Sequence, residues 1–435
     1  DWSSDVCSSD LNGMRLIGFD LRALPVDSQG QHDLQVLADW LPDTALLCTM
    51  AANNETGVIT HLASIEKMLR QSGSKALWLV DCVQALGKLD LDLQHSRIDY
   101  APFSGHKLYA PKGIGMLYVR RGAPFTPLMA GGGQEGGLRS GTENMPGIAA
   151  LGAVLDALQR GDTFASHARL CSYRDRLQQS LQGAFPAMVF NTPPAHALPT
   201  TLNFSVPGIS SKAMLDVLDA AGLRVSAGSA CSASKAAPSY VLEAMGLPAW
   251  RTTSAVRLSI GPLVSAATID AACSAIARCA EVLLAMHCGD EAEAASIDRL
   301  LADAPCSAED AAALTLQWGG LAAFLATHPT TRLVDVREAA EYHAGHGLHC
   351  GTLAAINVPL STLTTLPATW PQSRNLPLVL VCRSGKRSLK AALWLRSQGF
   401  LQVHHLHGGL ALRPVERSAA ITHAAGDAIA VCAAA

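Results

Sequence analysis

The sequence has 435 residues, 49% hydrophobic and 16% charged, with a formal net charge of −3 at pH 7. This length predicts about two to four domains with packed cores, and the charge balance gives no reason to expect a nucleic-acid partner. We find no apolar run long enough for a membrane span, and the twelve irregularly spaced cysteines, without a CxxC pair, predict a reducing cytoplasmic location and no metal site.

The start of the chain has no structural period. Residues 1–11 repeat Ser-Ser-Asp and resemble the in-frame translation of a sequencing-library adaptor. We therefore exclude them from reasoning about the fold, as one excludes a fusion scar.

Two apolar runs, residues 45–50 and 76–80, are predicted strands that end in polar groups. The first leads to Asn54, and the second leads to Asp81 and Gln84. A carboxylate at a strand end can pair with a pyridinium nitrogen, and the two amides can hydrogen-bond an oxygen on the same ring. Taken singly, these residues are better explained as turn and cap residues.

A third apolar run, residues 98–103, is followed by Ser104, Gly105, His106 and Lys107. A lysine just past a buried strand, with a hydroxyl and an imidazole before it, is where a pyridoxal phosphate enzyme places its Schiff-base nitrogen and phosphate donors. Alone, such a lysine is more often a solvated surface charge. Three strand ends that meet at one edge of a parallel sheet predict a ligand crevice there.

Further along the chain, a thiol and a guanidinium could complete this site. Cys231 lies among small residues in the stretch 226–233, where a mobile thiol can reach a substrate sulfur, although it could be an incidental loop cysteine. Arg257 alternates with Val256 and Leu258, so we expect it to face a cleft and bind a substrate carboxylate; the alternative is a surface arginine of an edge strand.

Five motifs together resemble the NifS-like cysteine desulfurases, class V of the aminotransferase fold, over about residues 12–285. They are Asn-Asn-Glu-Thr-Gly (53–57), Asp-x-x-Gln (81–84), Ser-Gly-His-Lys (104–107), Pro-Lys-Gly-Ile-Gly (111–115) and Arg-Ser-Gly-Thr (139–142). The resemblance implies an α/β fold, the pyridoxal-phosphate-dependent transferase fold type I, with a large parallel-sheet domain and a small α/β domain.

The same resemblance implies residue roles. Lys107 would carry the cofactor as a Schiff base, Ser104 and His106 would hold its phosphate, and Thr142 would reach the phosphate bound by a partner subunit of a homodimer. The resemblance also implies an N-terminal phosphate turn and a ring-stacking histidine, neither of which can be assigned in this chain.

A second domain is predicted after a connector, residues 286–312, that is rich in Ala, Asp and Glu. Apolar strands are expected at residues 331–338 and 376–381, and the second leads into Cys382 and a glycine-containing loop before a helix. Backbone N–H groups and the helix dipole would then point at the sulfur and stabilise its negative charge. The loop residues that would surround the sulfur are Arg383, Ser384, Gly385, Lys386 and Arg387.

This segment resembles a rhodanese sulfurtransferase domain over about residues 313–413, together with Asp-Val-Arg-Glu (335–338) and His-Gly-Gly (407–409). The rival is a phosphatase of the same architecture. Four residues separate Cys382 from Arg387, whereas the phosphate cradles of cysteine phosphatases hold five, so we favour sulfur transfer. The match fades after Gly409.

The sequence therefore predicts a cysteine desulfurase fused to a rhodanese domain, which converts L-cysteine to L-alanine and forms a persulfide on Cys231. Cys382 could then receive the sulfur and pass it to an acceptor protein, such as an iron-sulfur scaffold or a thiolation enzyme. The alternatives are a selenocysteine lyase and an inactive fragment. The expected parts are residues 1–11 (adaptor), 12–146 (large domain), 147–285 (remainder of the desulfurase, with the small domain), 286–312 (linker), 313–413 (rhodanese-like domain) and 414–435 (uncertain tail).

Overall fold

The computed structural model describes residues 18–227, 239–285, 308–344, 347–363 and 373–413. Cys231, residues 1–11, most of the expected linker and the tail after residue 413 lie outside these ranges. The chain divides into two compact units, Asp1–Cys288 and Gly289–Ala435.

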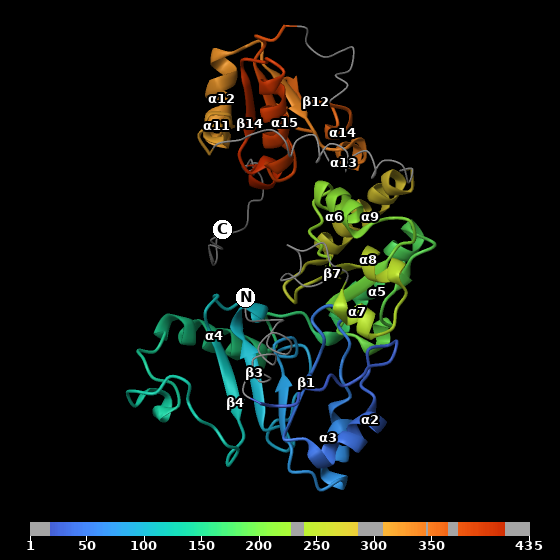
Figure 1. Cartoon of the computed structure of the whole chain (residues 1–435), viewed down its shortest axis with the longest axis vertical. Helices are drawn as coiled ribbons and strands as arrows, with labels where there is room; N and C mark the ends of the chain where they lie inside the picture. The colour runs from blue at the N-terminus through green and yellow to red at the C-terminus, as the bar shows by residue number, and fades with distance from the viewer. Residues whose placement is uncertain (1–17, 228–238, 286–307, 345–346, 364–372, 414–435) are drawn as a thin grey trace. The chain divides into compact units, whose positions relative to one another are not determined.

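The first unit contains a four-stranded sheet in the order β1-β2-β3-β4, formed by Leu46–Met50, Leu77–Asp81, Tyr100–Ser104 and Gly115–Val119. Strands β1 to β3 are parallel, and β4 pairs with β3 in the antiparallel direction, beside it in Figure 1. The predicted strands are confirmed within one or two residues at their ends. Because β1, β2 and β3 are parallel, their carboxyl ends meet at one edge of the sheet.

Helices cover this sheet because their apolar faces match its apolar surface. The helices are α2 (Leu34–Trp40), α3 (Leu62–Gln71) and α4 (Met145–Arg160), with short 3₁₀ turns η1 (Leu41–Asp43), η2 (Gly105–Leu108) and η3 (Gln134–Gly137). Ile65 and Leu69, four residues apart on α3, are buried with Trp78 and Val80 of β2 in one core cluster. This core fixes the strand ends that carry the polar motifs.

The rest of the first unit is a three-stranded antiparallel sheet with helices. Its strands are β5 (Val189–Phe190), β6 (Thr201–Ser205) and β7 (Val256–Ser259), in that order. The helices are α5 (His167–Ala184), α6 (Ser211–Ala220), α7 (Tyr240–Ala244), α8 (Ala249–Ser254) and α9 (Ala266–Ala285), with the turn η4 (Pro194–His196). Along β7, Val256 and Leu258 are buried and Arg257 alternates with them, as predicted.

The second unit is built on a five-stranded parallel sheet, in the order β12-β9-β13-β14-β8. These strands are Ile356–Asn357, Arg332–Asp335, Leu378–Val381, Val403–Leu406 and Thr315–Leu316, and a small hairpin adds β10 (His349–Cys350) and β11 (Leu353–Ala354). The helices are α11 (Ala308–Ala313), α12 (Trp318–Thr327), α13 (Ala339–Ala344), α14 (Leu360–Leu363) and α15 (Lys386–Ser397), followed by the turn η5 (Gly409–Leu412).

Strand β13 is buried on both faces, which explains its continuous apolar sequence. Leu378 and Leu380 pack in the core cluster that contains α15, whereas Val379 and Val381 pack in the cluster that contains Leu321 of α12. Figure 1 shows these helices flanking the sheet. Cys382 therefore directly follows a central strand that is buried between two helical layers.

None of the helices in the described residues is long and apolar enough to cross a membrane.

Candidate active site and the two cysteine loops

Strands β2 and β3 end in the side chains that the sequence singled out. Asp81 is the last residue of β2 and is 3% exposed, and its Oδ1 accepts a hydrogen bond of 2.9 Å from the Val83 N–H. Burial raises the pKa of Asp81, and the bond from Val83 partly opposes that shift. A buried carboxylate of this kind gains free energy from a cationic partner.

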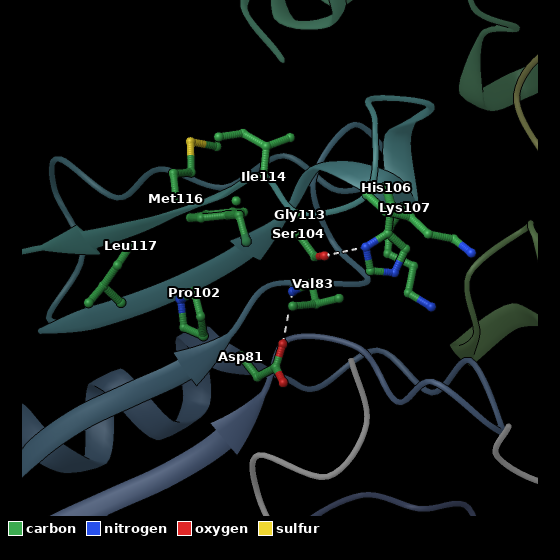
Figure 2. Close-up of a pocket in the computed structure, with 13 residues that line it drawn as sticks. Asp81, Val83, Pro102, Ser104, His106, Lys107, Gly113, Ile114, Met116 and Leu117 are labelled. Carbon is green, nitrogen blue, oxygen red and sulfur yellow. Dashed lines mark hydrogen bonds between the residues drawn. The ribbon is translucent and has the colours of Figure 1, made fainter. Parts of the chain in front are cut away.

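A pocket of about 780 Å³ opens beside Asp81. Figure 2 shows Ser104 and His106 on its wall, joined by a 2.7 Å hydrogen bond between the Ser104 Oγ and the His106 Nδ1, with Lys107 next to them. Burial and the charges of Lys107 and Lys112 lower the pKa of His106. The other lining residues are Val83, Pro102, Phe103, Lys112, Gly113, Ile114, Gly115, Met116 and Leu117.

The close pairing of β3 with β4 shapes this pocket. Gly115 pairs with Ser104, and a Cβ at Gly115 would lie 2.5 Å from the Phe103 carbonyl oxygen, so a larger residue would push the strands apart. The absence of a side chain at Gly115 thus lets the segment from Gly113 to Leu117 lie close to the turn that carries Lys107.

Gln84 does not line the pocket but contacts a second lysine. Lys88 donates a 3.1 Å hydrogen bond from Nζ to the Gln84 Oε1. Burial lowers the pKa of Lys88 to about 8, and the charge of Lys107 contributes to that shift. The sequence reasoning missed Lys88, although its spacing of four residues from Gln84 on a helical turn was a usable signal.

Arg257 and Asn54 lie together, but outside the pocket lining. The Arg257 Nη1 donates a 2.6 Å hydrogen bond to the Asn54 carbonyl oxygen, while burial lowers the pKa of Arg257 and the charge of Glu55 opposes this. Within the described residues, the buried Nε of Arg257 has no hydrogen-bond partner. A carboxylate ligand would satisfy such a donor. The Arg257 backbone also pairs with Ser226, which precedes the undescribed segment that holds Cys231.

Thr142 is exposed and does not line the pocket. No partner chain is present, so the role predicted for Thr142 in a second subunit stays a prediction.

In the second unit, Cys382 directly follows β13 and is fully buried. The Gly385 and Ser388 N–H groups donate to its Sγ at 3.2 and 3.3 Å. Helix α15 begins at Lys386, three residues before the amphipathic stretch expected from the sequence. The loop between strand and helix is therefore very short, and the backbone groups face the sulfur as predicted.

The His-Gly-Gly turn supports this loop from the side. The Leu410 N–H donates to the Cys382 carbonyl oxygen at 2.9 Å. Gly409 has φ +55°, and a Cβ there would lie 2.2 Å from the same oxygen. Only glycine fits this close backbone approach.

Among the cationic residues of the loop, Lys386 is exposed and Arg383 is half-buried. Ser384 is also exposed. Arg387 is bound by Glu341, whose two carboxylate oxygens accept from the two Nη atoms at 2.5 and 2.6 Å. Asp335 and Arg337 form a fully buried ion pair nearby. The sequence did not reveal Glu341 as the partner of Arg387, because the two residues are 46 positions apart and form no local pattern.

The model of the family "Aminotransferase class-V" matches residues 7–272, and that of the "Rhodanese-like domain" matches residues 321–412. The first match spans more than half of the chain. The chain belongs to the class-V aminotransferase family. It carries a C-terminal rhodanese-like domain after the class-V region, and both resemblances seen in the sequence are confirmed.

Relatives of this class-V chain include a protein named cysteine desulfurase 2 from Trichormus variabilis, 44% identical over 254 residues, which are 58% of this chain and 63% of that protein. A cysteine desulfurase from Bradyrhizobium diazoefficiens is 40% identical over 261 residues, covering 60% of this chain and 65% of that protein. The chain thus spans less than two thirds of the length of these relatives.

A solved structure described as a NifS-like protein is similar with a TM-score of 0.57 and 31% identity, covering 65% of this chain and 73% of that one. This similarity and the parallel sheet of the second unit confirm the predicted α/β fold class.

The class-V family implies dependence on pyridoxal phosphate, and the pocket fits that cofactor. A buried carboxylate, Asp81, suits a protonated ring nitrogen, while Ser104, His106, Lys107 and Lys112 supply hydroxyl, imidazole and ammonium groups that suit a phosphate and a Schiff base. In the part of the chain that the structure describes, no cluster of His, Cys, Asp or Glu could hold a metal ion.

Proposed function

We propose that this chain is a pyridoxal-phosphate-dependent cysteine desulfurase that converts L-cysteine to L-alanine, forms a persulfide on Cys231 and relays sulfur to Cys382. The observation that carries this proposal is the pocket that joins Asp81 of β2 to the Ser104-His106-Lys107 turn after β3. The identity of 44% to a cysteine desulfurase supports the choice of reaction within the class-V family.

In this proposal Lys107 holds the cofactor, Asp81 pairs with its ring nitrogen, and Ser104 and His106 bind its phosphate. Asn54 and Gln84 bind the oxygen on the ring, with Gln84 oriented by Lys88. When bound, pyridoxal phosphate supplies an electron sink for the carbons of the substrate.

The chain's own residues then orient the substrate and move its protons. Arg257 binds the substrate carboxylate, and its buried Nε, which has no hydrogen-bond partner in the part of the chain that the structure describes, supports this role. Lys107 acts as base and then as acid: it removes the proton at the substrate α-carbon, and one proton is delivered to the β-carbon and one back to the α-carbon before alanine leaves. Lys88 and Lys107 repel each other as like charges, and this repulsion contributes to the lowered pKa of Lys88.

Cys231 is the nucleophile for sulfur. Its thiolate attacks the substrate sulfur, the bond between that sulfur and the β-carbon breaks, and alanine leaves. Cys382 then takes the sulfane sulfur, because its two backbone N–H donors stabilise charge on sulfur.

We further propose that the chain works as a homodimer, in which Thr142 reaches the partner subunit's cofactor phosphate. Exposed apolar side chains near Thr142 support a covered surface there, among them Leu128, Leu138 and Met145. The final acceptor would be an iron-sulfur scaffold or a thiolation enzyme.

The test is to incubate the purified chain with pyridoxal phosphate and L-cysteine, quantify alanine, and map persulfides on the peptides that hold Cys231 and Cys382. We expect alanine and persulfide on both peptides, and loss of the Cys382 signal in Cys231→Ser. Persulfide on Cys382 in that variant would contradict the relay. No alanine and no bound cofactor would favour the inactive fragment, and a higher rate with selenocysteine would favour the lyase.

A further inference from the structure

A buried carboxylate, that of Glu55, lies close to Arg257. Glu55 is 2% exposed, and its Oε2 accepts a 2.6 Å hydrogen bond from the hydroxyl of Ser239, the N-cap residue of α7. The buried Nε of Arg257 has no hydrogen-bond partner in the described part of the chain. The Glu55 carboxylate is therefore bound by a hydroxyl, and the guanidinium keeps a donor for a ligand.

Two hydrogen bonds hold the segment around Glu55 against the strand that carries Arg257. The Arg257 Nη1 donates to the carbonyl oxygen of Asn54, the residue before Glu55, at 2.6 Å. Asn203 of β6 pairs with Arg257 of β7, and its Nδ2 donates to the Glu55 carbonyl oxygen at 3.0 Å. The Asn53 side chain also accepts from the Glu55 N–H at 2.9 Å. The position of Glu55 relative to Arg257 is thus fixed by the fold.

The two side chains interact through their charges. Burial lowers the pKa of Arg257, and the charge of Glu55 opposes that shift, so the carboxylate stabilises the charged guanidinium. Charges in a buried site are screened much less than charges in water. A ligand carboxylate that binds Arg257 is therefore attracted by the guanidinium and repelled by Glu55.

This repulsion affects substrate and product alike. L-Cysteine and L-alanine carry the same α-carboxylate, so an arginine without a counter-charge would hold both tightly. Binding energy that is equal in the ground state and the transition state does not raise kcat, and a tightly held product leaves slowly. A fixed negative charge near Arg257 lets the guanidinium orient the carboxylate while it limits the strength of binding.

We propose that Glu55 is a positioning residue that acts through Arg257: its buried charge lowers the affinity of the site for α-carboxylates, sets the KM for L-cysteine and promotes the release of L-alanine. This inference rests on the function proposed above, in which Arg257 binds the substrate carboxylate, and it identifies the group that limits that binding.

The experiment compares a charged and an uncharged ligand of the same shape on the full chain with pyridoxal phosphate. The charged ligand is 3-mercaptopropionate, and 3-mercaptopropionamide has an amide in place of the carboxylate. Isothermal titration calorimetry gives the Kd of each ligand, and an alanine assay gives the KM and kcat for L-cysteine. The variant Glu55→Gln removes the charge and keeps an oxygen that can accept from Ser239.

Two control variants separate the charge from the hydrogen bond and from the net charge of the chain. Ser239→Ala removes the hydroxyl that binds Glu55 and keeps the Glu55 charge. Glu66→Gln removes an equal charge from α3, where that carboxylate binds Arg70. Thermal scans show whether each variant folds.

We expect E55Q to bind 3-mercaptopropionate about fivefold more tightly than the unmodified chain does, and to bind the amide within about twofold. The KM for L-cysteine should fall about fivefold without a rise in kcat, and L-alanine should inhibit about fivefold more strongly. A merely structural role would not separate the charged ligand from the uncharged one. S239A and E66Q should leave the ratio of the two Kd values unchanged.

An unchanged ratio in E55Q would overturn the inference, and alanine formation by the same protein would leave the proposed function standing. The same carboxylate-selective shift in S239A or in E66Q would assign the effect to the hydrogen bond or to net charge, and would also overturn the inference. Binding of neither ligand, with no alanine formed, would overturn the inference and the proposed function together.

A second variant keeps the inference testable if E55Q does not fold. Glu55→Asp retains the charge, so its ratio of the two Kd values should equal that of the unmodified chain. Carboxylate-selective tightening in E55D would overturn the inference.

Discussion

Single buried charges set the chemistry that this chain can perform. Asp81 is almost inaccessible to water, and burial raises its pKa. A folded-state pKa above the unfolded value means that this group stabilises the fold only at low pH, and that the contribution is lost as the pH rises through the folded pKa. The ionised carboxylate is therefore retained at a cost to stability, as functional groups often are.

Asp81→Asn should separate function from stability. The amide cannot pair with a protonated ring nitrogen, so we expect alanine formation to fall about 100-fold or more, as for the loss of a charge-assisted bond of about 2 to 3 kcal/mol. The midpoint of thermal unfolding without cofactor should stay equal or rise. Alanine assays and thermal scans would measure both, with Asp92→Asn as the control, because Asp92 is exposed and pairs with the exposed His95. Full activity in Asp81→Asn would contradict the proposed role of Asp81 in the cofactor site.

Lys88 makes the stability of the fold depend on pH in the opposite direction to Asp81, so that stability rises with pH. Burial and then Lys107 lower its pKa to about 8, so the unfolded chain, with a value near 10.5, binds more protons between these limits. Stability should therefore rise from pH 8 toward pH 10.5, by about 1 to 2 kcal/mol for this residue. Urea titrations of the cofactor-free chain and of Lys88→Met should differ by this amount across the window. Parallel pH curves for the two proteins would contradict the prediction.

At the scale of elements, both sites depend on short connections between a buried strand and the segment after it. Ser104 ends β3 and the turn η2 begins at the next residue. Cys382 directly follows β13, and α15 begins at Lys386. Such short connections leave the backbone little freedom, and in the second unit the turn at Gly409 packs against the loop as well, so the N–H groups there are held in place.

Gly409→Ala tests this rigidity in the second unit. The added Cβ would meet the Cys382 carbonyl oxygen at 2.2 Å in a backbone with φ +55°, so the cradle must shift. We expect about 1 to 3 kcal/mol of destabilisation and at least a tenfold loss of sulfur loading on Cys382, with alanine formation unchanged.

The control for this variant is Gly351→Ala, which has φ +59° and open space around the added Cβ, and which therefore carries the backbone strain without the collision. Equal effects of the two variants on Cys382 loading would show that strain alone, and not the close approach at Gly409, explains the loss.

At the scale of the whole molecule, exposed apolar side chains indicate association. Leu128 is fully exposed, and Met145 and Leu138 are more than half exposed, all within the segment that contains Thr142. Large exposed apolar side chains within one segment are consistent with the proposed interface.

The proposed homodimer predicts a mass of about twice 45.6 kDa in light scattering. Leu128→Asp should shift the protein toward the monomer, because a desolvated carboxylate is costly at an interface, and should weaken cofactor binding if Thr142 acts across it. Leu401→Asp, an equally drastic change at an exposed leucine of the second unit, should leave the mass unchanged. A monomeric unmodified chain would refute the homodimer.

The sequence by itself determined both families, the strand ends and four of the residues that line the pocket, because these features depend on neighbours in the chain. Asp81 and Ser104 end apolar strands and His106 and Lys107 follow one, and parallel strands bring their ends together. The Cys382 loop could be predicted for the same reason, since strand, glycine and helix start are consecutive.

Only the tertiary structure decided which distant groups pair. Arg257 contacts the Asn54 carbonyl across 203 residues, and Arg387 is bound by Glu341 across 46. Neither pairing has a period or spacing in the sequence, because a buried charge takes whichever partner the fold brings within reach. The sequence alone counts Arg387 as an available cation at the Cys382 loop, whereas in the fold its guanidinium is bound by the Glu341 carboxylate.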